Sequence, residues 1–364
     1  MKKKILVISV GVVPPSVMIG GMAVVYHLVK RLARDEFFEI HVLTALPRGT
    51  GSEIDEWVRQ QKEKNKLTLH FVKSESPLLI RLLFFVKALS LNAKYKFDLI
   101  HDYSSSPLLV GLTGILGKLC RCKTLHTLCV VNNGFLGSRK LAFGFSWVDK
   151  VIVTAPNLLS LKRNVDCLPL GVDTEEFKTY PKDFERTVLF LGSLDERKGA
   201  AVLMGAAKEI IEKHPDIKFI FASYGKEGRE ALQKINSGFE KNIKFLTGMQ
   251  DVPQLLTEAD VFVLPAVSLH GTLTPPLTLI EAMSVGKPCV VSDICEGDGL
   301  VEDGVNCLLF RSGDYIDLSG KIDLLLGNGS LREKLSQNAR QKIIEQFDIE
   351  KVSAKMSGLY RRLV

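Results

Sequence analysis

The sequence lacks several features that would assign it at once to a specialised class of protein. Its seven cysteines include no C-x-x-C pair, the spacing that is typical of zinc sites and thioredoxin-type redox motifs. No apolar run reaches the roughly 18 residues that a membrane-spanning helix needs. Several cysteines lie inside apolar runs, where a free thiol behaves as a small hydrophobe. The sequence therefore predicts a folded protein in a reducing, cytoplasmic environment.

Acidic residues are scarce in the first part of the chain. Residues 1–166 hold 12 Asp and Glu against 24 Lys and Arg, whereas the remainder holds 29 against 24. This asymmetry indicates an anionic partner, either nucleic acid or an anionic membrane surface, unless the basic face is simply solvated. The segment Ser76–Phe97 favours a membrane at the inner face, because it joins bulky apolar residues to four basic residues and has no acid. The alternative is a core helix with basic ends.

The chain is long enough for two domains, since single cores usually stop growing beyond about 250 to 300 residues and this chain has 364. Apolar, β-branched runs alternate with helical stretches: KILVISV, EIHVLTA, LTLHFV, FDLIHD, KTLHTL and KVIVT, then TVLFLGS, IKFIFAS, IKFLTG, DVFVLPA, PCVVSD and NCLLF. Such runs suit strands buried on both faces of a parallel sheet. We predict an α/β fold of two Rossmann-like, doubly wound parallel-sheet domains facing a central cleft, residues 1–166 and 167–348. The final helix, about 349–364, is expected to pack back on the first domain.

Loops that follow the strands are the places to search for a site, because open α/β sheets bind ligands beyond the carboxyl ends of their strands. After the first strand, Gly20 and Gly21 open a helix and leave amides for an anion or a sugar, unless they only tighten a turn. They lack the G-x-G-x-x-G spacing of dinucleotide sites, which disfavours a nicotinamide enzyme. After TVLFLGS, Arg197 and Lys198 stand at the mouth of a helix, where dipole and charge suit a diphosphate. A solvated loop would show the same charges.

Glu281 lies near the start of a short helix in LTPPLTLIEAM, after two prolines. One interpretation is a favourable contact with the helix dipole, which requires no ligand. The other is a ligand site, in which the amides of Leu277 and Thr278 are free and the carboxylate accepts hydrogen bonds from a ribose diol. Tyr224 and Met249, at other strand ends, are candidates for contact with a base.

Three polar residues follow strands of the first domain. His126 in KTLHTL is a candidate for the same cleft, although a lone histidine is more often structural. His101 and Asp102 in FDLIHDYSSSP stand at a neighbouring strand end and are candidates for an acceptor site.

Taken in order, seven segments resemble the retaining GT-B glycosyltransferases of family 4, also called glycosyl transferases group 1. The segments are GGMAVVYHLVKRLA, FDLIHD, WVDKVIVTA, LPLGVDTEEF, FLGSLDERKG, PPLTLIEAMSVGKPCVVSD and LVEDGVNCLLFRSGD. The resemblance implies a GT-B fold with a nucleotide-sugar donor held mainly by the second domain. It implies that Lys198 binds the donor diphosphate, Glu281 its ribose and His126 its sugar, with Gly20 and Gly21 near the diphosphate. No metal or other cofactor is implied, which agrees with the absence of a D-x-D triplet.

The sequence departs from the family pattern at three positions. The family usually has G-R-x-x-x-x-K-G, but Ser193 stands where the arginine is expected, and Arg197 is a candidate replacement. The family's paired glutamates lie eight residues apart, yet Leu273 stands eight before Glu281. Pro276 replaces the usual glycine of that loop.

The predicted function is retaining transfer of a hexosyl or related group from a nucleoside diphosphate sugar to a hydroxyl acceptor. The acceptor is expected to be a glycan, a lipid-linked glycan or a small molecule, with no role for nucleic acid and a place in cell-envelope or glycan biosynthesis. Two alternatives stay open: a non-catalytic nucleotide-sugar-binding partner, and a nucleotide-sugar epimerase of the same architecture.

Overall fold

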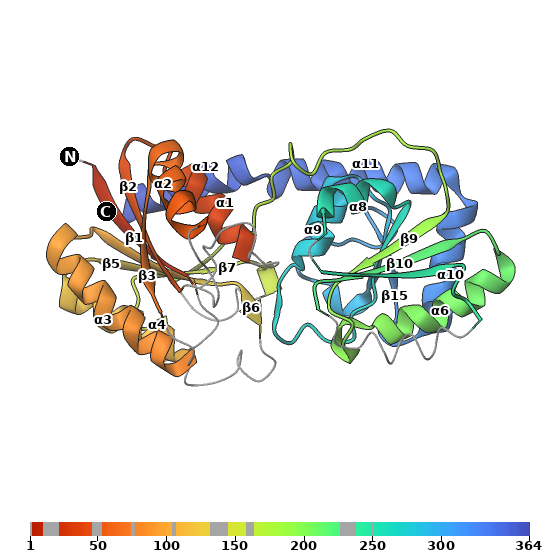
Figure 1. The fold of residues 1–364 in the computed structure, drawn as a ribbon, viewed down its shortest axis with the longest axis horizontal. Helices are drawn as coiled ribbons and strands as arrows, with labels where there is room; N and C mark the ends of the chain where they lie inside the picture. The colour runs from red at the N-terminus through yellow and green to blue at the C-terminus, as the bar shows by residue number, and fades with distance from the viewer. Residues whose placement is uncertain are drawn as a thin grey trace. The chain divides into compact units, whose positions relative to one another are not determined.

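The computed structural model describes residues 2–9, 22–45, 53–73, 77–103, 107–131, 145–157, 164–225, 238–248 and 250–364. The chain divides into two compact units. Unit 1 contains residues 1–171, 271–274 and 349–364, and unit 2 contains residues 172–270 and 275–348. Each unit has its own parallel sheet with helices on both faces (Figure 1). Among the described residues, no helix has the length and apolar character needed to cross a membrane.

Unit 1 is built on a seven-stranded sheet of order β3-β2-β1-β4-β5-β7-β8 in which neighbouring strands run parallel. The strands are β1 (Lys3–Ile8), β2 (Phe38–Ala45), β3 (Leu67–Val72), β4 (Leu99–Tyr103), β5 (Lys123–Leu128), β7 (Lys150–Val153) and β8 (Val165–Cys167). Alternate residues of β1 enter separate cores, Ile5 and Val7 on one face and Leu6 and Ile8 on the other. Burial on both faces explains why these strands are continuous apolar runs.

The helices of unit 1 form two layers. Helices α1 (Met22–Leu32), α2 (Glu53–Asn65) and α12 (Ile349–Leu363) pack on the Ile5 face. Helices α3 (Pro77–Tyr95) and α4 (Pro107–Cys120) pack on the Leu6 face. Although α12 ends the chain, it lies beside α1, and its Glu350 pairs with Arg31 at 3.1 Å (Figure 1). A short antiparallel pair, β6 (Val130–Val131) and β13 (Thr272–Leu273), completes the unit.

Unit 2 is built on a six-stranded parallel sheet of order β11-β10-β9-β12-β14-β15. The strands are β9 (Thr187–Leu191), β10 (Lys218–Ser223), β11 (Ile243–Thr247), β12 (Val261–Leu264), β14 (Cys289–Ser292) and β15 (Leu308–Phe310). The helices are α6 (Ala200–Lys213), α8 (Val252–Glu258), α9 (Leu277–Ser284), α10 (Tyr315–Gly327) and α11 (Gly329–Gln346), with short 3₁₀ turns η3 (Glu196–Lys198) and η4 (Asp293–Cys295).

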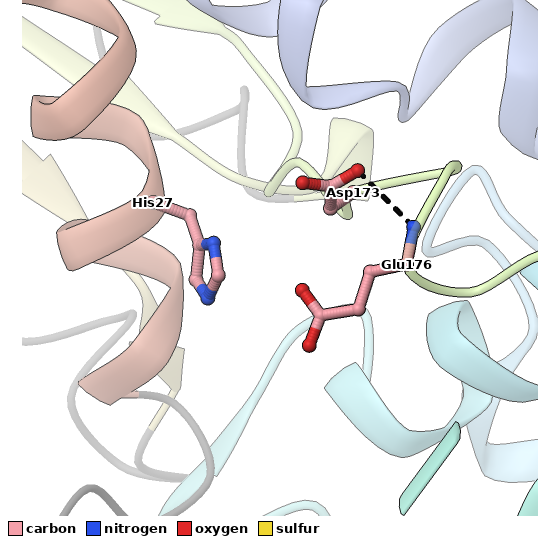
Figure 2. Close-up of side chains that lie close together, drawn as sticks. All are labelled: His27, Asp173 and Glu176. Carbon is pink, nitrogen blue, oxygen red and sulfur yellow. Dashed lines mark hydrogen bonds between the residues drawn. The ribbon is translucent and has the colours of Figure 1, made fainter. Parts of the chain in front are cut away.

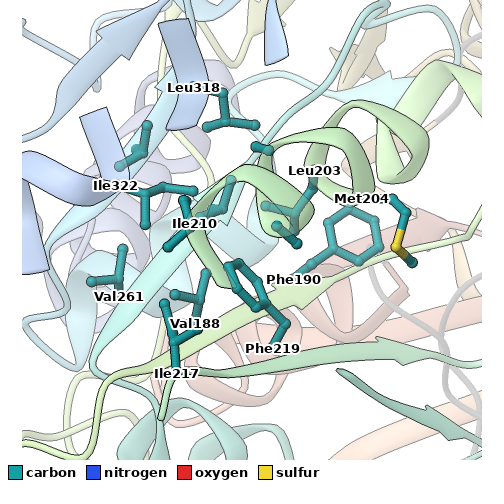
Figure 3. Packing of buried hydrophobic residues seen from close by; sticks show 14 of the residues in the cluster. Val188, Phe190, Leu203, Met204, Ile210, Ile217, Phe219, Val261, Leu318 and Ile322 are labelled. Atoms are coloured by element: carbon teal, nitrogen blue, oxygen red, sulfur yellow. The ribbon is translucent and has the colours of Figure 1, made fainter. Parts of the chain in front are cut away.

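The core of unit 2 lies between this sheet and the helices α6 and α10. Figure 3 shows Val188, Phe190 and Phe219 from the strands meeting Leu203 of α6, and all four are fully or almost fully buried. Leu318 and Ile322 of α10 close the same cluster. Dense packing of this kind makes the ends of β9 and α6 a rigid support for the loop between them.

The order of strands in unit 2 reverses direction beside β9. The chain runs from β9 outwards to β10 and β11, then returns to place β12 on the other side of β9. Adjacent loops diverge at such a topological switch point, which is where doubly wound sheets bind ligands. The predicted α/β fold with two Rossmann-like domains is confirmed. The structure changes unit after Gly171, and Val165–Cys167 form the edge strand β8 of unit 1.

Candidate donor site

The loop after β9 is organised by the carboxylate of Asp195. Its Oδ2 accepts hydrogen bonds from the Ser193 hydroxyl at 2.8 Å and from Nη2 of Arg197 at 3.0 Å, while its Oδ1 accepts from the backbone N–H of Lys198 at 3.1 Å. Burial acts to raise the pKa of Asp195, but these hydrogen bonds lower it below its ordinary value. Asp195 therefore stays ionised and fixes the turn η3 that carries Lys198.

The loop after β9 is also bonded directly to the loop after β12. The backbone carbonyl of Arg197 accepts hydrogen bonds from the N–H groups of Val267 at 2.9 Å and Ser268 at 3.1 Å. Gly199 has a φ of +72° and lies against the Pro265 carbonyl. These contacts join the two loops at the switch point of the sheet, at the N-terminal end of α6.

Lys198 stands at this junction and is partly buried. Burial lowers the pKa of its ammonium group, and the neighbouring Arg197 acts in the same direction, while Asp195 opposes them. Helix α6 follows at once, and its N-cap Gly199 provides no side-chain hydrogen bond. A cation beside an uncapped helix start is suited to an anionic group.

Glu281 lies in the second turn of α9, as the fifth residue of the helix, and the first turn contains no acid. A dipole contact in the first turn is therefore not its role. Glu281 is partly buried, and no hydrogen bond or ion pair joins its carboxylate to another described residue. Burial, and then the charge of Glu176, raise the pKa of Glu281 to about 8. An ionisable group in this condition is typical of a ligand site, because a ligand's hydroxyl groups would supply the missing partners.

The N-terminal end of α9 follows Pro276, which offers no side-chain cap. The Pro276 carbonyl accepts from the amides of Leu279 and Ile280. The amides of Leu277 and Thr278 have no acceptor among the residues that the structure describes. These two amides are therefore free to bind a ligand.

Two further groups of unit 2 stand close to Glu281. The pKa of the Tyr224 hydroxyl is raised by burial and by the charge of Glu281, which places this residue after β10 near the carboxylate. Glu176 belongs to the turn 173–177, and Figure 2 shows its backbone N–H donating to Oδ1 of Asp173, at 3.3 Å. The raised pKa of Glu281 therefore comes from burial and from the turn that carries Glu176, and the charge of Glu281 in turn raises the pKa of Tyr224.

Arg340 of α11 holds this turn against the end of α9. Its Nη1 donates to the carbonyl of Phe177 at 2.8 Å and also to the carbonyl of Ser284, and its Nη2 donates to the carbonyl of Thr174 at 3.0 Å. One guanidinium thus ties together the C-terminal end of α9 and the turn that carries Glu176. Sequence reasoning missed Arg340, because nothing in the local pattern of α11 separates it from a solvated helical arginine.

In unit 1, His126 and Asp102 form a buried pair on neighbouring strands. They stand opposite each other in the register of β4 and β5, and Nδ1 of His126 lies 3.0 Å from Oδ2 of Asp102. Both side chains are almost completely buried, and Nε2 of His126 has no hydrogen-bond partner among the described residues. Because a carboxylate accepts from Nδ1–H, Nε2 is left as the reactive ring nitrogen.

His101 has a different environment. Its side chain is fully buried, with Nδ1 2.6 Å from the Tyr360 hydroxyl and Nε2 2.7 Å from the Thr127 hydroxyl. Burial holds the pKa of His101 well below its ordinary value. With both ring nitrogens engaged, this geometry favours a structural role that links α12 to the sheet, and it offers no atom for an acceptor contact.

The other predicted residues have varied positions. Gly20, Gly21 and Met249 lie outside the described residues. Arg197 is exposed and paired with Asp195, so its cation is already shared with a carboxylate. Leu273 lies in β13, opposite Val130 of β6, and therefore belongs to unit 1.

The sequence analysis did not identify Asp195. Its place before the turn Glu196–Lys198, where it caps η3, is a signal from which it could have been predicted.

Comparison with known proteins assigns unit 2 to a family. Residues 172–342, nearly all of unit 2, match the family described as glycosyl transferases group 1. The chain is 27% identical over 309 residues to the UDP-Gal:alpha-D-GlcNAc-diphosphoundecaprenol alpha-1,3-galactosyltransferase of Escherichia coli, covering 74% of this chain and 77% of that one. It is 30% identical over 251 residues to the N,N'-diacetylbacillosaminyl-diphospho-undecaprenol alpha-1,3-N-acetylgalactosaminyltransferase of Campylobacter jejuni, covering 65% and 64%.

Solved structures extend the likeness to both units. Anabaena HepE, solved in complex with UDP, superimposes with a TM-score of 0.77 at 18% identity, covering 99% of this chain and 100% of that one. Identity at this level shows the fold, which is GT-B. The family match covers residues 172–342, so this part of the chain belongs to the family of glycosyl transferases group 1, and the protein is a glycosyltransferase.

Proposed function

We propose that the protein transfers a sugar from a nucleoside diphosphate sugar to a hydroxyl acceptor with retention of configuration, and that unit 2 holds the donor. The observation that carries the proposal is the carboxylate of the partly buried Glu281, whose pKa is about 8 and which has no partner among the described residues. The two hydroxyl groups of a ribose would supply the hydrogen bonds that it lacks.

The donor diphosphate is assigned to the junction of the β9 and β12 loops. Cleavage of the bond to the sugar leaves negative charge on the diphosphate, and pre-positioned donors aimed at that charge lower the barrier. Lys198 supplies an ammonium group there, and the amides of Leu277 and Thr278 supply two further donors. The lowered pKa of Lys198 supports this assignment, because a bound diphosphate would compensate the cost of burying the cation.

Arg197 and Ser193 have a supporting role in the proposal. Ser193 stands where the family usually has arginine, and here its hydroxyl holds Asp195, which in turn fixes η3. Arg197 would reach the diphosphate only after its ion pair with Asp195 opens. We therefore assign the main phosphate contact to Lys198.

We further propose that transfer requires no divalent metal, since Lys198 and the helix amides can take up the charge that a metal would otherwise neutralise. His126 is proposed to contact the donor sugar through Nε2, with Asp102 orienting its ring. The support for this is the buried Asp102–His126 pair together with the resemblance of KTLHTL to the family's histidine segment.

The acceptor is proposed to be a lipid-linked glycan. The named activities of the Escherichia coli and Campylobacter jejuni relatives both involve a diphospho-undecaprenol acceptor. Such an acceptor would place the protein at the inner face of a membrane, in cell-envelope or glycan biosynthesis. UDP is the first nucleotide to test, because HepE was solved with UDP.

The decisive experiment combines nucleotide binding with product analysis. A nucleotide present at 100 times its dissociation constant should raise the free energy of unfolding by about 2.7 kcal/mol, which a thermal shift measures. The matching nucleoside diphosphate sugar should then be consumed only with a hydroxyl acceptor, in the presence of excess EDTA, and give a product with the donor's anomeric configuration. Nucleotide binding without turnover would indicate a non-catalytic partner, and interconversion of the donor without an acceptor would indicate an epimerase.

A further inference from the structure

Helix α3 has apolar residues on the side that faces away from the sheet of unit 1. Its inner stripe, Phe84, Ala88 and Leu91, is buried against the strands. Leu79, Leu82 and Val86 form a second stripe and are 46%, 57% and 55% exposed. Val86 is two residues from both Phe84 and Ala88, which at about 100° per residue places it on the opposite side of the helix. Helix α3 is therefore apolar on two sides, and one of them is open.

Helix α4 continues this open surface. It packs beside α3 on the same face of the sheet, and its Leu116 enters the same buried cluster as Phe84 (Figure 1). Ile115 and Leu119, one turn apart, are 37% and 61% exposed. Because the two helices lie in one layer, their outer stripes share a surface, which we call the α3–α4 face: Leu79, Leu82, Val86, Ile115 and Leu119.

The segments that form the α3–α4 face carry basic residues and no acidic ones. Residues 77–97 and 107–123 contain seven Lys and Arg and no Asp or Glu. Lys87, Lys94 and Arg121 are exposed, and Lys118 is exposed beside Trp147, with its ammonium 4.1 Å from the indole ring. The acid that follows the first segment, Asp98, pairs with Lys3 at 3.0 Å, and Asp149, which lies outside both segments, pairs with Lys123 at 3.0 Å.

We propose that the α3–α4 face docks on an anionic lipid bilayer. Its aliphatic side chains enter the boundary between headgroups and acyl chains, and the surrounding lysines and arginines contact lipid phosphates. Neither helix crosses the bilayer, because no described helix is long and apolar enough to do so. The protein therefore lies on the membrane surface.

Charge distinguishes a bilayer from a second copy of the chain. In a symmetric dimer the same patch meets itself, so the basic residues around the α3–α4 face would oppose one another. An anionic bilayer instead offers a continuous negative surface and an apolar layer beneath it. A soluble acidic protein is the competing occupant, and an absence of binding to anionic vesicles would favour it.

The experiment measures co-sedimentation of the full chain with vesicles, without nucleotide or acceptor, so its outcome does not depend on the proposed activity. Vesicles of phosphatidylcholine are compared with vesicles that contain roughly 30% phosphatidylglycerol, on which each basic residue near the surface is worth about fivefold in partitioning, or about 1 kcal/mol. We expect binding to the anionic vesicles that salt weakens, and much weaker binding to phosphatidylcholine alone.

Two variants test the named side chains. Leu82→Gln with Leu119→Gln removes apolar contact, and Lys87→Glu with Arg121→Glu reverses two charges; each should reduce partitioning to anionic vesicles at least tenfold. All four positions are partly or largely exposed, so thermal unfolding should stay close to that of the parent and show that each variant folds.

Matched controls come from other surfaces of the same chain. Ile316→Gln with Leu324→Gln changes two exposed apolar residues of α10 in unit 2. Lys355→Glu changes an exposed lysine of α12, on the opposite face of the unit 1 sheet. Both controls should bind vesicles like the parent chain.

Three results would overturn the proposal. The first is parental binding by both α3–α4 variants. The second is no preference of the parent chain for anionic vesicles, or no binding to them at all. The third is a dimer in solution that the Leu82→Gln with Leu119→Gln variant dissociates, which would assign the face to a second copy.

Discussion

Gly199 stands so close to Pro265 that a Cβ added at position 199 would lie 1.7 Å from the Pro265 carbonyl oxygen. Gly199 also has a φ of +72°, a left-handed conformation that is costly for residues with a side chain. This contact joins the loops after β9 and β12 and places Lys198 beside the start of α6. The donor site thus depends on a close approach of two backbones.

Gly199→Ala should therefore damage both stability and donor binding. The left-handed conformation alone costs about 1 to 2 kcal/mol, and the clash with a rigid carbonyl adds to it. We expect a lower midpoint of thermal unfolding and weaker binding of nucleoside diphosphate in calorimetry. Gly320→Ala, at a helical glycine of α10 with open space around it, is the control: it should leave nucleotide binding unchanged and should not lower the unfolding midpoint, because alanine is the better helix former. Parental nucleotide affinity in Gly199→Ala would show that the junction does not form the site.

Lys198→Ala should lower the transfer rate by on the order of 100-fold or more, by analogy with the loss of one donor to a developing anion. Lys198→Arg should recover part of that loss, because a cation is retained. Lys213→Ala, an exposed lysine at the far end of the same helix α6, should have no effect. Steady-state kinetics with donor and acceptor measures all three. A Lys198→Ala rate within about twofold of the parent would remove Lys198 from the mechanism.

Glu281→Gln should have opposite effects on stability and binding. The folded-state pKa of about 8 lies above the ordinary value of 4.5. The stability linked to the protonated carboxyl is therefore fully present below about pH 4.5 and is lost as pH rises through about 8. The neutral glutamine avoids this loss, so the variant should gain more in unfolding temperature at pH 9 than at pH 5.

Binding supplies the second measurement on Glu281→Gln. The amide cannot accept two strong hydrogen bonds from a diol, so affinity for a nucleoside diphosphate should fall about tenfold at pH 7 to 8. The 2′-deoxy nucleotide should bind the parent and the variant with similar affinity. Equal loss of affinity for both nucleotides would place the ribose elsewhere.

Arg340→Met should destabilise unit 2 by roughly 2 to 4 kcal/mol, because three backbone carbonyls lose a charged donor at a partly buried site. The turn 173–177 would then be released, and with it the charge of Glu176 near Glu281. We expect a lower midpoint in urea and a lower pKa of Glu281, measured by the pH dependence of nucleotide binding. Gln337→Met, at an exposed position of α11, is the control. An unchanged pH profile in a folded Arg340→Met protein would contradict the coupling.

Asp102→Asn tests the pair with His126. The amide keeps the shape of the side chain but no longer holds Nδ1–H with a negative charge, so the ring loses its preferred tautomer. We expect the transfer rate to fall at least tenfold with little change in nucleotide affinity. A loss of nucleotide affinity without loss of rate would refute a role of this pair in contacting the sugar.

The strands and their order of appearance were readable from the sequence, because a strand buried on both faces must be a continuous apolar run. Lys198 was readable for a similar local reason, since it follows a strand and precedes a helix. The role of Glu281 was not decided locally. Its distance from the helix start suited either a dipole contact or a ligand, and the structure excludes the dipole contact by beginning α9 at Leu277.

Contacts between distant segments explain the other differences. Leu273 stands eight residues before Glu281, where the family pattern has a glutamate, yet it pairs with Val130, more than a hundred residues earlier. His101 was predicted to contact the acceptor, but the hydroxyl of Tyr360, near the end of the chain, lies at its ring. The residues next to Leu273 or His101 in the sequence do not predict these contacts, because the contacts depend on how whole helices and strands pack.

The sequence by itself determined the α/β architecture, the two sheets and the cation of the candidate site, since periodic burial and strand-end position are local properties of the chain. Tertiary structure alone decided that Gly199 contacts Pro265 and that Arg340 holds the turn bearing Glu176. It also decided that Glu281 has no partner among the described residues while its pKa rises to about 8. The physical reason is that burial, charge proximity and unsatisfied hydrogen bonds depend on which segments contact each other in space. The order of residues along the chain does not predict those contacts.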